Sequence, residues 1–224
     1  MKKISLTDVT LRESSKGQEN SLSFKEIIET AKILDKLDVD IINIAPIINE
    51  KVDTLLVRTI TSAVKNSVLS IPVGITKESV DIAWKAINSA VKPRLSVELP
   101  VSTVQMEFNS GLKATNVIDL IDSLVSRSKE LCNDVDFSAL DATRSEKDFL
   151  INALTTAINA GATTVTICDT AGLLMPHEMD VFINSLYESI PSLKTVPLAV
   201  RCSDELSMAT ACAATAIRAG ATEI

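Results

Sequence analysis

Short β-rich stretches alternate with longer amphipathic stretches along the whole chain. The longer stretches run for about 12 to 18 residues and gather apolar side chains on one helical face, as 24–37 does with Ile27, Ala31 and Leu34. A regular alternation of strands and helices predicts parallel strands joined by right-handed crossovers. The predicted strands span 3–7, 40–44, 69–73, 94–99, 134–137, 164–168 and 197–202.

Two of the predicted helices begin with a capping signal. Ser23 precedes Phe-Lys-Glu, and Ser145 precedes Glu-Lys-Asp. A serine in this position can accept a hydrogen bond from a backbone N–H of the first helical turn. We therefore expect Ser23 and Ser145 to be the N-caps of these helices.

One segment of the chain is repeated. Residues 157–163 (Ala-Ile-Asn-Ala-Gly-Ala-Thr) recur at 216–222 with a single change. In each copy a helix ends at Ala-Gly, where the glycine is free to adopt a left-handed conformation, and a strand follows. A repeated αβ unit favours a (β/α)8 barrel, the TIM barrel. The alternative, an open doubly wound sheet, is disfavoured because no Gly-rich dinucleotide fingerprint follows the first strand.

The predicted units fill most of such a barrel. They are followed by the start of an eighth strand near Glu223, whereas a complete barrel takes about 250 residues. We expect residues 1–224 to form a single TIM-barrel domain that lacks most of the last βα unit. Such a barrel should have a gap between its first and seventh strands, open to solvent or to another chain.

The composition narrows the class of protein. Hydrophobic residues make up 46% of the chain and charged residues 23%, the balance of a protein with a sizeable apolar core. The formal net charge of −7 argues against nucleic-acid binding, which is favoured by a basic surface. No apolar run approaches the roughly 20 residues of a membrane span, and the Met-Lys-Lys start leads into a strand pattern rather than a signal peptide. We expect a cytoplasmic protein with no nucleic-acid or membrane partner.

The thiol and imidazole groups form no metal-binding pattern. Cys132, Cys168, Cys202 and Cys212 include no Cys-x-x-Cys pair, so we interpret them as reduced and mostly buried. His177 is the only histidine and cannot form a His-based metal site by itself. We expect it on the surface near a helix start.

Candidate chemistry lies where the predicted strands end, because barrel active sites are built at the C-terminal ends of strands. The first strand is followed by Asp8, Arg12 and Glu13, which could hold a metal and neutralise a developing oxyanion. A solvated loop with an internal salt bridge is an equal alternative. The sixth strand ends in an acid and a hydroxyl, Asp169 and Thr170, next to a glycine turn.

The seventh strand also ends in charged and polar residues. Arg201 is a candidate anion-binding residue, and Ser203 follows it at a position where it could cap the next helix. Both interpretations remain open from the sequence.

These strand ends resemble those of a known family. Residues 8–13 (Asp-Val-Thr-Leu-Arg-Glu) are similar to the signature of the metal-dependent barrels that include isopropylmalate synthase, homocitrate synthase and hydroxymethylglutaryl-CoA lyase. Further similar motifs follow in order at 34–40, 135–138, 141–145, 169–172 and 209–221, with Pro176. The resemblance covers essentially the whole chain and implies a TIM barrel.

The resemblance also implies a reaction and its residues. In that family a divalent metal chelates a 2-oxo acid, and acetyl-CoA loses a methyl proton, attacks the polarised carbonyl and is finally hydrolysed. Carried over by position, Arg12 would be the catalytic residue that steadies the oxyanion, and Glu13 would be a metal ligand. Ser102, Arg144 and Thr170 would bind the substrate.

Several positions depart from the family pattern. The His-x-His that supplies two metal ligands is Arg201-Cys202-Ser203 here, and an arginine repels a cation. The catalytic glutamate is Leu140, and the histidine near the end of the fourth strand is Gln105. The remaining departures are Asn43 for an acid and Ser14-Ser15-Lys16 for Gly-Glu-Gln. We expect Mg²⁺, Mn²⁺ or Zn²⁺ to bind weakly or not at all.

Two functions follow from matches and departures together. One is an acyltransferase of amino-acid biosynthesis, similar to homocitrate or isopropylmalate synthase, that condenses acetyl-CoA with a 2-oxo acid. It could act as one subunit of a two-chain enzyme, so we expect a homo- or hetero-oligomer with a related synthase subunit. The other is a catalytically inactive paralogue with a structural or regulatory role.

Overall fold

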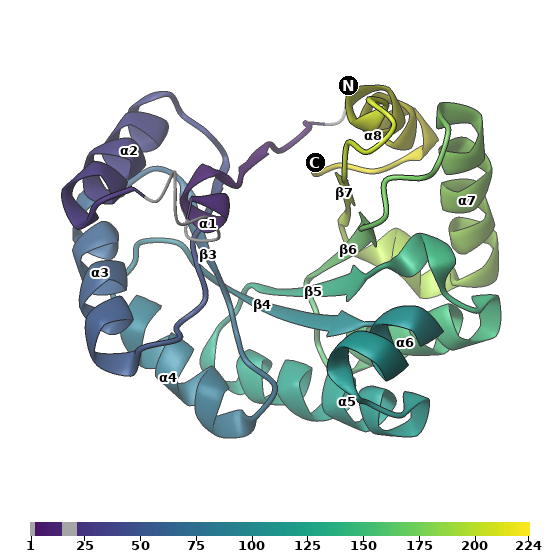
Figure 1. Ribbon diagram of the computed structural model, residues 1–224, viewed down its shortest axis with the longest axis horizontal. Helices are drawn as coiled ribbons and strands as arrows, with labels where there is room; N and C mark the ends of the chain where they lie inside the picture. Colours follow the sequence, from purple (N-terminus) through teal and green to yellow (C-terminus); the bar gives the residue numbers. More distant parts are fainter. Residues whose placement is uncertain (1–2, 15–21) are drawn as a thin grey trace.

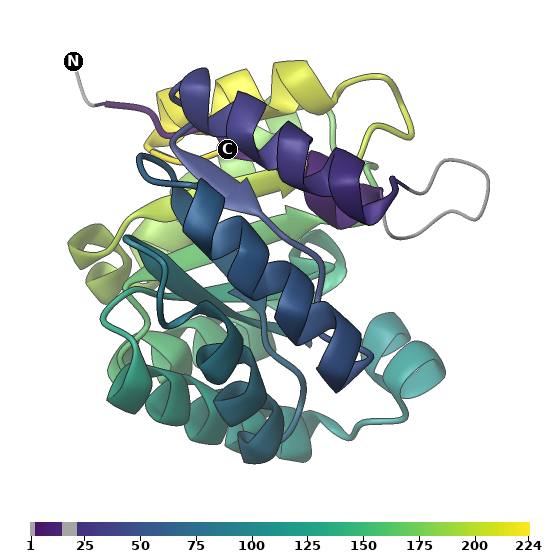
Figure 2. The ribbon, with the colours of Figure 1, turned by 90° about the vertical axis from the view of Figure 1, so that its left-hand side faces the viewer.

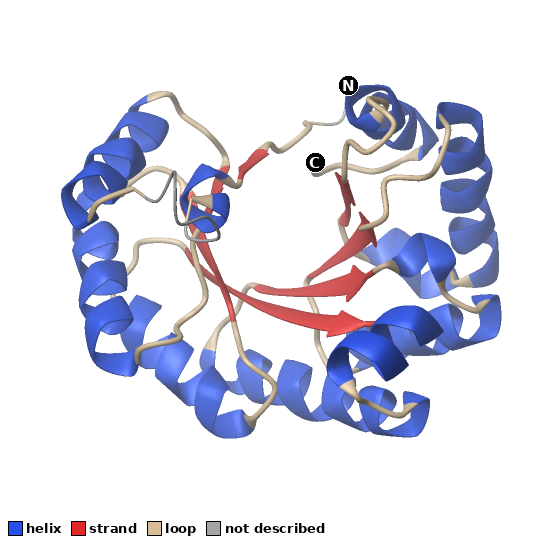
Figure 3. Cartoon of the chain, viewed as in Figure 1, coloured by secondary structure: helices blue, strands red, loops and turns tan. Residues whose placement is uncertain are grey.

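The chain folds into a ring of parallel strands surrounded by helices (Figures 1 and 3). The computed structural model describes residues 3–14 and 22–224. Within these residues, seven parallel strands form one sheet in the order β1 to β7. The strands are β1 (Thr7–Asp8), β2 (Ile41–Asn43), β3 (Val68–Pro72), β4 (Pro93–Pro100), β5 (Val135–Leu140), β6 (Thr164–Asp169) and β7 (Leu198–Cys202).

Helices follow the strands and cover the outside of the ring. Figure 2 shows α2 and α3 running side by side on this outer surface. The α-helices are α1 (Thr10–Glu13), α2 (Phe24–Lys36), α3 (Glu50–Ala63), α4 (Lys77–Ile87), α5 (Ala114–Leu131), α6 (Lys147–Asn159), α7 (Pro176–Ser189) and α8 (Ala209–Ala219). Shorter turns are the π-helix η1 (Gln105–Ser110) and the 3₁₀ turns η2 (Ala142–Arg144) and η3 (Pro191–Thr195).

The strand order confirms the barrel. Every strand pairs in parallel with the next strand in the sequence, as Glu98 of β4 pairs with Ser138 of β5. A doubly wound sheet would instead reverse its strand order at a switch point. The fold is a (β/α)8 TIM barrel without most of its last βα unit.

The last described residues lie in the position of an eighth strand. Glu223 forms parallel bridges with Ser5 beside β1 and with Ala199 of β7. The Ser5 N–H donates to the Thr222 carbonyl at 2.9 Å, and the Thr7 N–H donates to the Ile224 carbonyl at 2.7 Å. The expected gap between β1 and β7 is therefore bridged at one end of the barrel, and Figure 1 shows this segment running between the two strands.

Alternation along the strands divides apolar from polar groups. In β4, Leu95, Val97 and Leu99 are fully buried in the core between the sheet and the helices. The residues that alternate with them, such as Arg94 and Glu98, point into the barrel because successive strand residues face opposite sides. A barrel interior is usually packed with branched apolar side chains, so this polar interior is a departure that needs explanation.

One of the two predicted helix caps is correct. The Ser23 hydroxyl accepts from the Glu26 N–H, and the Glu26 carboxylate accepts from the Ser23 N–H, which together form a capping box. The prediction for Ser145 is wrong, because α6 begins at Lys147 and the Ser145 hydroxyl donates to the Val101 carbonyl at 2.7 Å. Ser145 thus ties the β5–α6 loop to the end of β4.

In the described part of the chain, no helix is long and apolar enough to cross a membrane. His177 is exposed at the start of α7, as expected.

Candidate functional site

A cavity of about 650 Å³ lies inside the barrel and extends toward α8. Its polar wall comes from inward-facing strand residues, and its apolar wall includes one face of α8. The polar lining residues are Thr7, Asp8, Glu13, Asn43, Ser70, Arg94, Asp136, Ser138, Thr166, Arg201, Thr210 and Glu223. The cavity thus runs from the C-terminal ends of the strands, which we call the upper end of the barrel, to the lower end. There it reaches residues 222–224, the closing segment between β1 and β7.

Two arginines share one carboxylate at the upper end of the barrel. Both terminal nitrogens of Arg12 donate to the two carboxylate oxygens of Glu98, one of them at 2.7 Å. Arg201 Nη1 lies 3.6 Å from Glu98 Oε1. Arg12 is 11% exposed and Arg201 is 34% exposed. Glu98 therefore fixes Arg12 firmly and Arg201 loosely.

Arg12 and Arg201 differ in their relation to the cavity. Arg201 lines it, whereas Arg12 and its partner Glu98 do not. The carboxylate of Glu13 lines the cavity mouth and lies 3.7 Å from Arg12 Nε. At the upper end of the barrel, the positive group that faces the cavity is thus Arg201.

The other acid of the first strand end has a local structural role. Asp8 accepts hydrogen bonds from the backbone N–H of Thr10 at 2.9 Å and from its hydroxyl at 3.2 Å. These contacts hold the turn into α1, which places Arg12 and Glu13 at the mouth of the barrel.

The thiol of Cys168 is buried next to Arg201. The two residues are register partners on β6 and β7. Burial raises the pKa of Cys168 to about 12, although the positive charge of Arg201 opposes this shift. Cys168 is therefore a neutral thiol at physiological pH and no candidate nucleophile.

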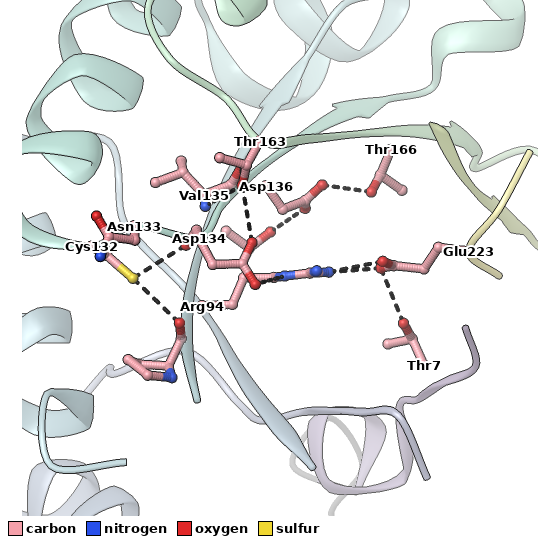
Figure 4. Close-up of polar contacts among 12 residues, drawn as sticks. Thr7, Arg94, Cys132, Asn133, Asp134, Val135, Asp136, Thr163, Thr166 and Glu223 are labelled. Carbon is pink, nitrogen blue, oxygen red and sulfur yellow. Dashed lines mark hydrogen bonds and ion pairs between the residues drawn. The ribbon is translucent and has the colours of Figure 1, made fainter. Parts of the chain in front are cut away.

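A second charged network lies at the lower end of the cavity, where Figure 4 shows it. Arg94 Nη1 donates to both carboxylate oxygens of Glu223, at 2.8 and 3.0 Å, and Arg94 Nε donates to Asp134 at 3.0 Å. Glu223 also accepts from the Thr7 hydroxyl at 3.3 Å. Burial opposes the charge of Arg94, but Glu223 and Asp134 outweigh it and raise the pKa of Arg94. This network links β4 to the closing segment.

Asp136 lies between the two ends of the cavity. Its carboxylate accepts hydrogen bonds from the hydroxyls of Ser96, Ser138 and Thr166, at 2.7 to 2.8 Å. Burial raises the pKa of Asp136, while Arg94 and the three hydroxyls favour its charged form. The hydroxyls take the place of bulk water around a buried acid.

The residues expected to bind substrate converge on Asp141. The Ser102 hydroxyl donates to the Asp141 carboxylate, Arg144 pairs with it at 2.8 Å, and the Thr170 hydroxyl accepts from the Asp141 N–H at 2.9 Å. Asp141 itself is fully buried with a positive φ of 61°. The structure thus brings Ser102, Arg144 and Thr170 together, around a carboxylate of the chain. None of the three lines the cavity that contains Arg201.

The strand-six turn packs closely on the strand-seven loop. Asp169 accepts from the Thr143 hydroxyl at 2.7 Å, and its carbonyl accepts from the Ser203 N–H at 3.1 Å. Gly172 has a φ of +60°, and a Cβ there would lie 2.6 Å from the Ser203 carbonyl oxygen. Ser203 is not a helix cap, because α8 begins at Ala209.

The residues of the expected metal site do not fit a divalent cation. Arg201 brings a positive charge to that position, Ser203 has a weak neutral oxygen, and Glu13 is half exposed beside Arg12. Within 3–14 and 22–224, no group of three or more His, Cys, Asp and Glu side chains is placed to hold a metal ion. Ser15 and Lys16, also departures from the family pattern, lie outside the described residues.

Sequence reasoning missed Glu98 and Asn43 as parts of the site. Glu98 had a readable signal, because it is a charged residue within a predicted strand in which Leu95, Val97 and Leu99 are apolar. Asn43 was noted only as a replaced acid. Its side-chain oxygen is buried and, among the described residues, has no hydrogen-bond partner.

Comparison with solved structures places the fold among known barrels. An HMG-CoA lyase from Acinetobacter baumannii, in complex with coenzyme A and 3-methylmalate, aligns with 99% of this chain and 73% of its own, at a TM-score of 0.79 and 12% identity. The carboxyl transferase domain of Rhizobium etli pyruvate carboxylase, with pyruvate, aligns with 100% of this chain and 40% of its own, at a TM-score of 0.73 and 16% identity. At such identities the likeness concerns the fold alone.

Sequence relatives are closer. The 2-isopropylmalate synthase of Aquifex aeolicus is 34% identical over 222 residues, and that of Pelotomaculum thermopropionicum is 33% identical over 222 residues. Each alignment covers 99% of this chain but only 43% and 44% of the respective relative, so the chain spans less than half of their length. The profile of the HMGL-like family matches residues 3–224. The chain therefore belongs to the HMGL-like family.

Proposed function

We propose that this chain is the barrel subunit of a cytoplasmic, oligomeric synthase that condenses acetyl-CoA with a 2-oxo acid. The observation that supports this most directly is the cavity at the strand ends, which has the partly exposed guanidinium of Arg201 in its wall. Condensation turns the ketone oxygen of the 2-oxo acid into an alkoxide, and a fixed positive charge stabilises such an oxyanion. The 2-isopropylmalate synthase relatives favour 2-oxoisovalerate as the acceptor, with 2-oxoglutarate as the homocitrate-type alternative.

Residues of this chain can bind and orient the reactants. We infer that Ser102, Arg144 and Thr170 hold the loops around Asp141 and contact the part of the substrate that extends beyond the cavity. Arg12 adds to the positive potential that stabilises the oxyanion, because Glu98 holds it in one cluster with Arg201. The proton of the acetyl methyl group needs a base, and Leu140 cannot provide one.

An inactive paralogue is the second candidate. It is favoured by one specific observation, the hydrocarbon side chain of Leu140 at the position where the resemblance places an acid. In this case the barrel would serve a related synthase as a structural or regulatory partner.

The test is an assay of the chain alone and together with a related synthase subunit from the same cell. Mass spectrometry would detect free CoA and the 2-hydroxy acid product with 2-oxoisovalerate or 2-oxoglutarate. We expect negligible product from the chain alone, because losing members of a catalytic unit costs several orders of magnitude. We expect turnover in the mixture.

The Arg12→Ala variant separates the two candidates. A large fall in turnover of the mixture would support an active site in this chain, whereas unchanged turnover would support the inactive partner. Robust turnover by the chain alone would contradict our interpretation of Leu140. Equal turnover by the related subunit with and without this chain would contradict both roles.

A further inference from the structure

We propose that Arg201 anchors the carboxylate of a 2-oxo or 2-hydroxy acid directly, so that the chain binds such ligands without a metal ion. The ligand class rests on the proposed function. The anchor itself rests on the placement of Arg201 in the cavity wall.

The first argument is that Glu98 holds the two arginines differently. Glu98 uses both carboxylate oxygens for Arg12, whereas its oxygen lies 3.6 Å from Arg201, which is longer than a hydrogen bond. A guanidinium has five N–H donors in a planar fork. Arg201 therefore has donors available on the side that lines the cavity.

The second argument is the charge of the cluster. Two guanidinium groups, Arg12 and Arg201, face the buried carboxylate of Glu98, and the nearby Cys168 thiol is neutral. Asp136 also acts electrostatically on Arg201, but burial raises its pKa and three hydroxyl groups already donate to it. Glu13, the other acid, is half exposed and lies toward Arg12. The part of the cavity wall formed by Arg201 is thus positive, and a carboxylate ligand completes it in a bidentate pair.

The third argument is an unsatisfied polar group in the same cavity. Asn43 is 92% buried, and among the described residues its side-chain oxygen has no hydrogen-bond partner. An unsatisfied buried acceptor is costly, so a ligand or water that donates to it is expected. The hydroxyl of a 2-hydroxy acid is such a donor, so the same cavity offers a hydrogen-bond acceptor, Asn43, in addition to the guanidinium of Arg201.

Arg201 would also take over the role of the two imidazole ligands, whose positions are occupied by Arg201 and Ser203 in this chain. A metal ion would bring positive charge to hold the carboxylate and the neighbouring oxygen. Arg201 supplies a permanent charge at the position where the resemblance places the two imidazoles, and it does so without a cation.

The test is calorimetric titration of the purified chain with 2-oxoisovalerate and with 2-isopropylmalate in buffer containing EDTA. We expect one site for at least one of these ligands. Arg201→Met should weaken binding by about 10- to 100-fold, since a charge-assisted pair is lost. Arg201→Lys should keep part of the affinity. Arg218→Met, which changes an exposed arginine on α8, is the matched control and should bind like the wild type.

A second variant protects the test against loss of folding. Glu98→Gln removes the negative charge that competes with the ligand, so we expect it to tighten binding while circular dichroism confirms a folded barrel. No binding by the wild type in EDTA, binding that appears only with added Mn²⁺, or equal affinity in Arg201→Met would each overturn the proposal.

The outcomes also distinguish this proposal from the proposed function. Binding that depends on Arg201, without turnover in any mixture, would support the Arg201 anchor and contradict the synthase function. Turnover that is insensitive to Arg201→Met would keep the synthase and remove the anchor.

Discussion

Cys168 is a single residue whose burial has a measurable consequence. Its pKa rises from 9.0 in an exposed thiol to about 12 in the folded chain. Above pH 9 the unfolded chain loses this proton while the folded chain keeps it, so stability must fall as pH rises. Between about pH 9 and 10, the unfolding free energy of the Cys168→Ala variant should fall by roughly 1 kcal/mol less than that of the wild type. Urea unfolding at both pH values measures this, and identical pH dependence would contradict the burial of an intact thiol.

At the residue scale, the sequence predicted where the chemistry lies better than how it is arranged. Arg12, Glu13 and Arg201 all lie at the upper end of the barrel, because strand ends meet there in any such fold. That Glu98 pairs with both arginines depends on side chains 86 and 103 residues away in the sequence. No local pattern encodes such pairing, which is why the sequence did not identify Glu98 as part of the site.

At the element scale, the link between β4 and the closing segment is the contact to test. Arg94 joins Glu223 and Asp134 in a nearly buried cluster. Arg94→Met would leave two acids without their counter-charge, and breaking such a pair costs about 3–5 kcal/mol of unfolding free energy. Adding Glu223→Gln should recover part of this loss, because the two sites are coupled. Urea unfolding of both variants checks this.

The control for that experiment is Arg218→Met, which removes an exposed arginine of α8 and should cost little. Strictly additive losses in the double variant would mean that Arg94 and Glu223 do not interact in solution.

Also at the element scale, the alternation of β-rich and amphipathic stretches predicted the order of strands and helices correctly. The residues at which the helices begin were less predictable. The repeated Ala-Gly turns end α6 and α8, and both Gly161 and Gly220 have positive φ values as expected. Ser145 is predicted as a cap, and Ser203 as a possible one, because serine is common at the N-termini of helices. In the structure, tertiary contacts with Val101 and Asp169 decide their roles instead.

At the scale of the whole molecule, charged side chains lie in the interior of the barrel. Apolar side chains fill the layer between sheet and helices, and the interior contains two charged clusters, around Glu98 and around Glu223. We propose that residues 1–224 act as one domain, because the contact between β4 and Glu223 joins distant parts of the chain across the barrel. A barrel with this interior depends on ion pairs where other barrels depend on branched apolar layers.

The central claim is that Arg201 takes the place of metal ligands in the upper cluster around Glu98, so that the described residues there form no competent metal site. Calorimetric titration of the purified chain with Mn²⁺ and Zn²⁺ tests it most directly. We predict no stoichiometric site tighter than about 1 μM, which corresponds to about 8 kcal/mol of binding free energy. The double variant Arg201→His, Ser203→His should bind more tightly, since it adds two imidazole ligands and removes a positive charge. One stoichiometric, tighter site in the wild type would contradict the account.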